Sequence, residues 1–186
     1  MHGRRYTKEP NAYFDYDNEK YGELAVHSLV KKNRKKVLVI LPPKEQFYSQ
    51  LIFKGANMAA NNSSIEIIVA ENITSSDTIN KISEYVSDTI KSNDSIDAAI
   101  VPTINSAMAT IAGFESNNKV IGQDFDIVSK DSIDFLKLFR KEIIVIEENV
   151  KKAGNFLAKA AINAAKTQNT PALQFLELPD DSHIKM

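Results

Sequence analysis

The residues near the start of the chain that could do chemistry are three closely spaced carboxylates, Asp15, Asp17 and Glu19. Carboxylates at alternate positions are the first ligands of a calcium-binding loop, which needs a glycine at its sixth position and a glutamate at its twelfth. Counted from Asp15, those two positions hold Lys20 and Val26. The spacing therefore argues against a calcium loop. The simpler interpretation is that Asp17 or Asn18 caps a helix that begins near residue 19.

Motifs for the common catalytic and cofactor chemistries are absent from the sequence. The glycines, at positions 3, 22, 55, 113, 122 and 154, give neither a dinucleotide-binding nor a phosphate-loop spacing. There is no cysteine for thiol catalysis, and the three histidines are too far apart in sequence to favour a metal site. A pair among Asp124, Asp126 and Asp131 could form a hydrolase dyad, which keeps a small α/β enzyme open as an alternative. We expect no cofactor, no metal and no catalysis.

The composition is that of an ordinary globular protein. The chain has 186 residues, of which 43% are hydrophobic and 25% are charged, enough for one or two lobes with a core. The net charge of −1 does not favour nucleic acid, and the basic run at 31–36 follows a predicted helix, whose dipole it complements. The longest apolar run, 37–41, is too short to cross a membrane, and the first ten residues show no secretory signal. We therefore expect a cytoplasmic protein without a membrane partner.

The elements that would position side chains alternate between two periodicities. The predicted strands are the apolar runs 37–41, 65–70, 98–102, 125–129, 143–146 and 172–178, and segments with apolar residues every three or four positions predict helices around them. Alternation of strands and helices, with continuously apolar strands, indicates an α/β fold with a parallel sheet. Ligands bind beyond the carboxyl ends of such strands. The segments at those ends are 41–48, 70–74, 102–105 and 129–132.

The order of these segments resembles the effector-sensing domain of LacI/GalR-type transcriptional regulators. The resemblance rests on DYDNEKYGELAVHSLV (15–30), FKGANMAAN (53–61), DAAIVPTINSAMATIAGF (97–114), IGQDFDIVSKD (121–131) and IEENVKKAG (146–154). It extends from about His2 to Leu178. It implies Rossmann-like, parallel-sheet lobes of the periplasmic-binding-protein-like type I fold, with an incomplete N-terminal lobe. It also implies that a DNA-binding helix-turn-helix and the first part of that lobe would precede Met1.

The same resemblance implies a division of the chain between two lobes. Residues 1–33 and 147–168 resemble remaining pieces of the N-terminal lobe, residues 34–142 and 170–179 resemble the C-terminal lobe, and 180–186 would be a tail. Regulators of this type bind a small polar effector, often a sugar, in the cleft between the lobes. The resemblance also implies that the intact protein is a homodimer. It would contact DNA only through the missing helix-turn-helix.

The resemblance also selects candidate effector-binding residues. These are Arg4, Asp17, Phe47, Tyr48, Thr103, Asn105 and Asp131. Each has a structural alternative, because the polar residues could cap helices, the aromatic residues could pack in a core, and Arg4 could be solvated. Gln50 and Ile52 stand where the family commonly has an arginine, and Lys130 departs from its glycine-aromatic pattern. These departures argue against an acidic effector. They also keep open a dimerisation domain that has lost its pocket. A solute-binding protein for sugar transport is a separate alternative, and the lack of a secretory signal in the first ten residues counts against it.

Overall fold

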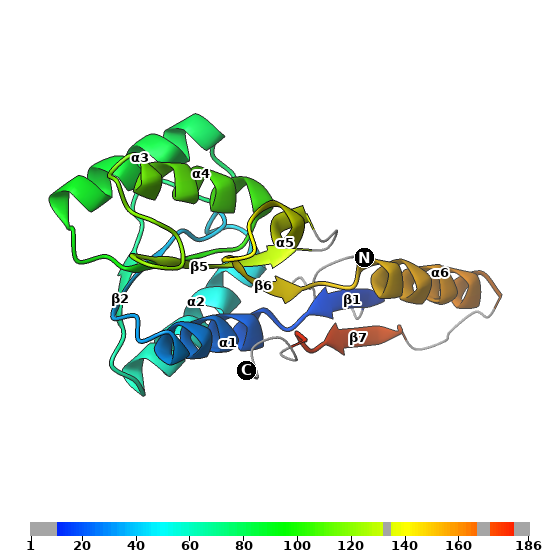
Figure 1. Ribbon diagram of the computed structural model, residues 1–186. Coiled ribbons are helices and arrows are strands. Elements are labelled where there is room, and N and C mark those ends of the chain that lie inside the picture. The colour runs from blue at the N-terminus through cyan, green and yellow to red at the C-terminus, as the bar shows by residue number, and fades with distance from the viewer. Residues whose placement is uncertain (1–10, 132–134, 167–171, 181–186) are drawn as a thin grey trace.

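The computed structural model of the chain describes residues 11–131, 135–166 and 172–180. Its elements are β1 Tyr13–Tyr16, α1 Asn18–Lys31, β2 Lys36–Val39, α2 Phe47–Asn61, β3 Glu66–Val69, α3 Ile79–Ser92, β4 Ala98–Val101, α4 Ile104–Glu115, β5 Asp126–Asp131, α5 Phe135–Phe139, β6 Ile144–Glu147, α6 Val150–Lys166 and β7 Gln174–Glu177. The strands form a five-stranded sheet, in the order β3-β2-β4-β5-β6, and a two-stranded sheet of β1 and β7 (Figure 1). All paired strands are parallel, which confirms the predicted fold class. Within the described ranges, each helix is too short or too polar to span a bilayer.

The five-stranded sheet is covered on both faces, and this explains why its inner strands are continuous apolar runs. In β2, Val37 and Val39 pack against α1 and α2, whereas Leu38 and the following Ile40 pack on the side of α3 and α4. Figure 1 shows these two helix pairs on opposite sides of the sheet. We call this sheet, together with α1 to α5, the larger unit.

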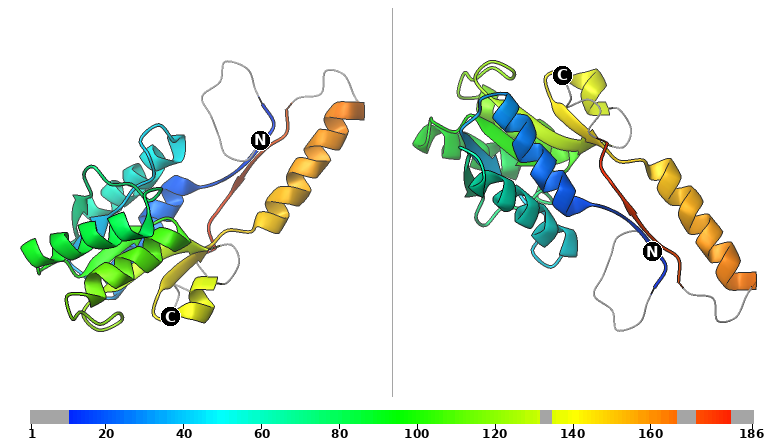
Figure 2. Two further views of the ribbon diagram at one scale, coloured as in Figure 1. Left: turned by 90° about the horizontal axis from the view of Figure 1, so that it is seen from above. Right: turned by 90° about the horizontal axis from the view of Figure 1, so that it is seen from below.

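The smaller unit, which we define as β1, β7 and α6, has an aromatic core. The Phe14 ring stacks on Phe175 with a centroid distance of 5.3 Å, and it lies 5.8 Å from the Phe156 ring of α6. Ala153 of α6 is buried against the same group. Figure 2 shows α6 running beside β1 and β7, away from the five-stranded sheet. The helix therefore covers a different sheet from the one that contains β2.

Two elements pack in units other than those expected from the sequence. The helix α1, expected with β1 in the N-terminal lobe, packs into the larger unit through Tyr21, Ala25 and Leu29. The strand β7, expected in the C-terminal lobe, pairs with β1 in the smaller unit along Tyr13–Tyr16. Apolar periodicity shows that an element has a face to bury, but it carries no information on which sheet buries that face.

The chain passes between the units at two described connections. Asp17 joins β1 to α1, and Glu148 and Asn149 join β6 to α6. An isolated bridge between Glu147 and Asp180 also brings the segment after β7 back to the end of β6. Both connections and the carboxyl end of β5 therefore lie at the junction of the two units.

Candidate functional site

Polar side chains from both units meet around the carboxyl end of β5. The Lys130 ammonium donates to Asn18 Oδ1 and, at 2.7 Å, to Glu148 Oε1. The same ammonium lies 4.8 Å from the centroid of the Tyr21 ring, within reach of a cation–π interaction. The Lys130 side chain is only 10% exposed, so these partners replace most of its water. We call the whole group the junction cluster, which consists of Tyr16, Asn18, Tyr21, Tyr48, Lys130 and Glu148.

The three tyrosines of the junction cluster are held neutral. Burial, followed by the charges of Glu148, Glu177 and Asp15, raises the pKa of Tyr16 to about 12. Burial and then the Glu148 carboxylate also raise the pKa of Tyr21 and of Tyr48. Desolvation and a nearby negative charge both disfavour a phenolate. The cluster therefore offers phenol groups, which can both donate and accept hydrogen bonds, next to a carboxylate.

The raised pKa of Tyr16 predicts a dependence of stability on alkaline pH. Tyr16 keeps its proton in the folded state up to a pKa of about 12, against an ordinary value of 10.0. Its contribution to folding is therefore complete below pH 10 and is lost as the pH rises from there through 12. We expect Tyr16→Phe to flatten the fall in the free energy of unfolding across this range, measured by urea titration at a series of pH values. Equal slopes in the variant and the parent would contradict the assignment.

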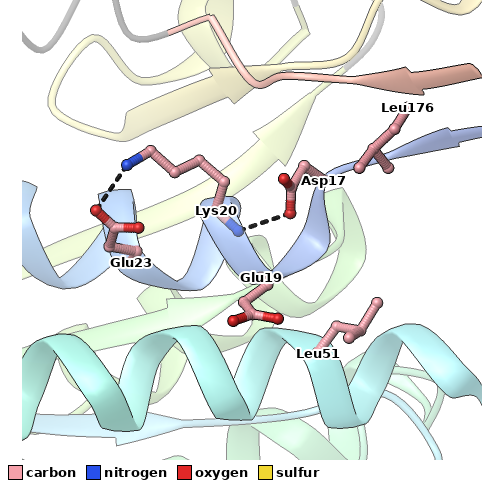
Figure 3. Close-up of a pocket in the computed structure, with 6 residues that line it drawn as sticks. All are labelled: Asp17, Glu19, Lys20, Glu23, Leu51 and Leu176. Atoms are coloured by element: carbon pink, nitrogen blue, oxygen red, sulfur yellow. Dashed lines mark hydrogen bonds and ion pairs between the residues drawn. The ribbon is translucent and has the colours of Figure 1, made fainter.

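A groove of about 360 Å³ lies between α1, α2 and β7. Figure 3 shows its lining residues, which are Asp17, Glu19, Lys20, Glu23, Leu51 and Leu176. The helices α1 and α2 belong to the larger unit and β7 belongs to the smaller unit. The groove is therefore shared by both units.

The charges along this groove are mostly paired. Lys20 Nζ donates to Glu23 at 2.6 Å, and Lys54 Nζ donates to Glu19 at 2.9 Å. Asp17 instead accepts the backbone N–H of Lys20 at 2.9 Å and so caps α1, as the sequence predicted. A carboxylate has room for further donors beyond one cap bond. Asp17 can therefore both cap the helix and accept a ligand hydroxyl.

The structure brings only some of the predicted effector residues to the junction. Asp17 lines the groove, and Tyr48 lies in the first turn of α2, with Phe47 before it. Thr103 forms a capping box with Ser106 at the start of α4, the structural alternative for this residue, and Asn105 follows it on that helix as an exposed side chain. The backbone of Asp131 ends β5 and pairs with Glu147. Its side chain and all of Arg4 lie outside the described part of the chain.

Two of the three aspartates considered for a hydrolase dyad, Asp124 and Asp126, have structural partners at the amino end of β5. Asp126 forms an ion pair with Arg34 at 2.6 Å, and Asp124 accepts the backbone N–H of Val120 at 2.8 Å. Asp124 lies just before β5 and Asp126 is its first residue, so both are at the amino end of the strand, whereas Asp131 is its last residue. Among the described residues, no three His, Asp or Glu side chains are grouped so that they could hold a metal ion.

Sequence reasoning missed Asn18, Lys130 and Glu148 as partners. Lys130 was visible only as a departure from a family pattern, although a lysine inside a buried strand requires a partner. Glu148 follows β6, whose carboxyl end is not among the strand-end segments selected from the sequence. Asn18 was considered only as a helix cap, whereas its amide donates to Tyr16 O at 2.9 Å and its oxygen accepts from Lys130.

Comparisons with known proteins give structures but no sequence relatives. No family model matches the chain, and no curated protein matches it. A complex of the transcriptional regulator CelR with cellobiose superposes with a TM-score of 0.81 at 13% identity, over 96% of this chain and 55% of that one. A putative LacI-family repressor from Corynebacterium glutamicum superposes with a TM-score of 0.83 at 13% identity, over 97% and 68%. The chain has the fold of LacI-type regulators.

Periplasmic sugar-binding proteins share this LacI-type fold. A substrate-binding protein of a sugar transport system from Bordetella parapertussis has a TM-score of 0.80 at 12% identity, over 100% of this chain and 63% of that one. A periplasmic binding protein/LacI transcriptional regulator from Alkaliphilus metalliredigens, in complex with D-xylulofuranose, has a TM-score of 0.75 at 18% identity. These similar structures are transcriptional regulators and binding proteins. The chain spans 55% to 68% of the length of the solved structures named here.

Proposed function

We propose that this chain is a ligand-sensing domain of a LacI-type transcriptional regulator, which binds a small, polar, sugar-like molecule where its two units meet. The observation that carries the proposal is the groove shared by α1, α2 and β7, with Asp17 in its wall. Solved structures of similar fold hold cellobiose or D-xylulofuranose. The wall of the groove contains carboxylates, which accept hydrogen bonds from sugar hydroxyls.

In the proposed mechanism, a ligand contacts both units and favours one of their relative orientations. A ligand shifts such an equilibrium only by its difference in affinity for the two states. Asp17 would contact the ligand from the connection between the units, and Arg4 would contact it from the N-terminal lobe. The contacts from the larger unit would come from Phe47, Tyr48, Thr103, Asn105 and Asp131. In the intact protein, a homodimer in the cytoplasm, the shift would change the spacing of DNA-binding heads supplied by a helix-turn-helix.

The ligand proposal is tested by separating the two roles of Asp17. A panel of mono- and disaccharides is first screened by thermal shift, and the affinity of a ligand found in this way is measured by calorimetry. Asn caps helices as well as Asp, so Asp17→Asn should leave the melting temperature of the free protein unchanged. Loss of a charged acceptor should nevertheless weaken binding by about tenfold or more.

The matched control is Asp88→Asn, because Asp88 pairs with Lys91 on the exposed face of α3. We expect this variant to bind the ligand as the parent does. If no sugar in the panel raised the melting temperature, or if Asp17→Asn bound the ligand as tightly as the parent, the proposed site would be rejected.

A solute-binding protein for sugar transport is the second candidate, since a transport protein superposes on the whole of this chain. Both candidates require a ligand at the junction and differ in what the full-length gene product does. An electrophoretic mobility-shift assay with DNA from its own upstream region separates them. Ligand-dependent retardation of that DNA favours the sensor, and ligand binding without any DNA binding favours transport.

A further inference from the structure

The two described connections between the units both run past the Lys130 ammonium. Asn18 is the first residue after the connection from β1, and Glu148 lies in the connection from β6 to α6. Lys130, at the end of β5 in the larger unit, donates a hydrogen bond to the side chain of each. A single ammonium thus joins two segments that are separated by more than a hundred residues in sequence.

The contacts of Asn18 extend this link into the smaller unit. Its Nδ2 donates to the carbonyl of Tyr16, the last residue of β1, at 2.9 Å, while its Oδ1 accepts from Lys130. A continuous chain of hydrogen bonds therefore runs from the end of β1, through the start of α1 and the end of β5, to Glu148. Rotation about the connection at Asp17 would change the separation between Asn18 Nδ2 and the Tyr16 carbonyl, and a shift of the connection after β6 would stretch the bond between Lys130 and Glu148.

The burial of the link makes it costly to break. The side chains of Lys130 and Glu148 are 10% and 22% exposed, so neither charge can be fully rehydrated without movement of its surroundings. A buried charge that loses its partner is strongly destabilising, in contrast to an exposed one. Two other ion pairs of the described residues act within one unit: Lys152–Glu177 joins α6 to β7, and Lys36–Glu66 joins β2 to β3.

We infer that Lys130 is a positioning residue that fixes the orientation of the smaller unit relative to the larger one, by holding both connections through Asn18 and Glu148. In this view the orientation is set in the free protein, before any ligand binds. The inference goes beyond the proposed sensing function, because it concerns the ligand-free chain and holds or fails independently of what the groove binds.

The inference is tested by measuring a distance between the units. The chain has no cysteine, so Asn57→Cys on α2 and Asn155→Cys on α6 introduce two spin-label sites, both at exposed positions. Double electron–electron resonance on the ligand-free protein should give one narrow distance distribution. We expect Lys130→Met to broaden this distribution by about twofold or to shift it, because several orientations become populated. Lys130→Arg, which can donate to both partners, should restore the narrow distribution.

The control is Lys91→Met, which removes a lysine from an exposed ion pair on α3 and should leave the distribution unchanged. Should Lys130→Met fail to fold, as shown by circular dichroism, Glu148→Ala removes the more exposed partner and should broaden the distribution in its place. If the distance distribution of Lys130→Met equals that of the parent, the inference is overturned. The same result for Glu148→Ala overturns it where that variant is used. Because no ligand is present, this outcome leaves the proposed binding function untouched.

Discussion

Gly55→Ala is expected to destabilise the protein by about 3 kcal/mol or more, although alanine is the better helix former. Gly55 lies in α2 at the point where this helix crosses α1. A Cβ built on Gly55 would be 1.8 Å from the carbonyl oxygen of Glu19, a contact that no side-chain movement can relieve because the obstacle is backbone. Gly22 of α1 faces α2 in the same way, with a built Cβ 2.2 Å from the carbonyl oxygen of Ile52. The two helices therefore pack backbone to backbone, and any side chain at either glycine forces them apart.

The matched control for this substitution is Gly154→Ala in α6. Apart from the adjacent residues and the backbone of α6 itself, no atom of the described residues lies within 4 Å of a Cβ built there, so the change in helix propensity dominates. We expect Gly154→Ala to stabilise the protein by about 0.5–1 kcal/mol. Urea denaturation of the parent, Gly55→Ala and Gly154→Ala gives the change in the free energy of unfolding for each substitution. A Gly55→Ala variant as stable as the parent would show that α1 and α2 do not cross at these glycines.

The second large effect is expected for Arg34→Met, which should lower the free energy of unfolding by about 3 kcal/mol or more. Arg34 Nε donates to the carboxylate of Asp126 at 2.6 Å, and the other guanidinium nitrogens donate to the carbonyls of Asp124 and Gln123 at 3.2 and 3.0 Å. The Asp126 side chain is only 2% exposed, so removal of Arg34 leaves a buried carboxylate without its charged partner. The guanidinium also ties the loop after α1 to the segment that leads into β5.

A double-mutant cycle separates the ion pair from the packing of the arginine stem. The double variant Arg34→Met/Asp126→Asn should be less destabilised than the sum of the two single variants, because the charge that Arg34 neutralised is gone. Lys91→Met removes a lysine from a pair in which both side chains are more than half exposed, and should change stability by less than about 1 kcal/mol. Strict additivity of the single variants would show that Arg34 and Asp126 do not interact.

The sequence predicted those features that depend on neighbouring residues. Continuous apolar runs such as 37–41 predicted strands buried on both faces, and the structure divides Val37 and Leu38 between opposite faces. The cap at Asp17 followed in the same way from the residue type before a helix. The basic run after α1 was only partly understood, because Arg34 turns inward to Asp126 instead of serving the helix dipole.

Only the tertiary structure decided which surfaces meet. Lys130 and Asn18 are 112 residues apart, and no local pattern could pair them. The same holds for β7, which pairs with β1 and not with the sheet that contains β2. Local periodicity is set by side chains a few residues apart, and it determines whether a segment is a helix or a strand and which face it buries. Which surface that face packs against depends on the shape and charge of residues far away in the sequence. The junction cluster is therefore seen only in the tertiary structure.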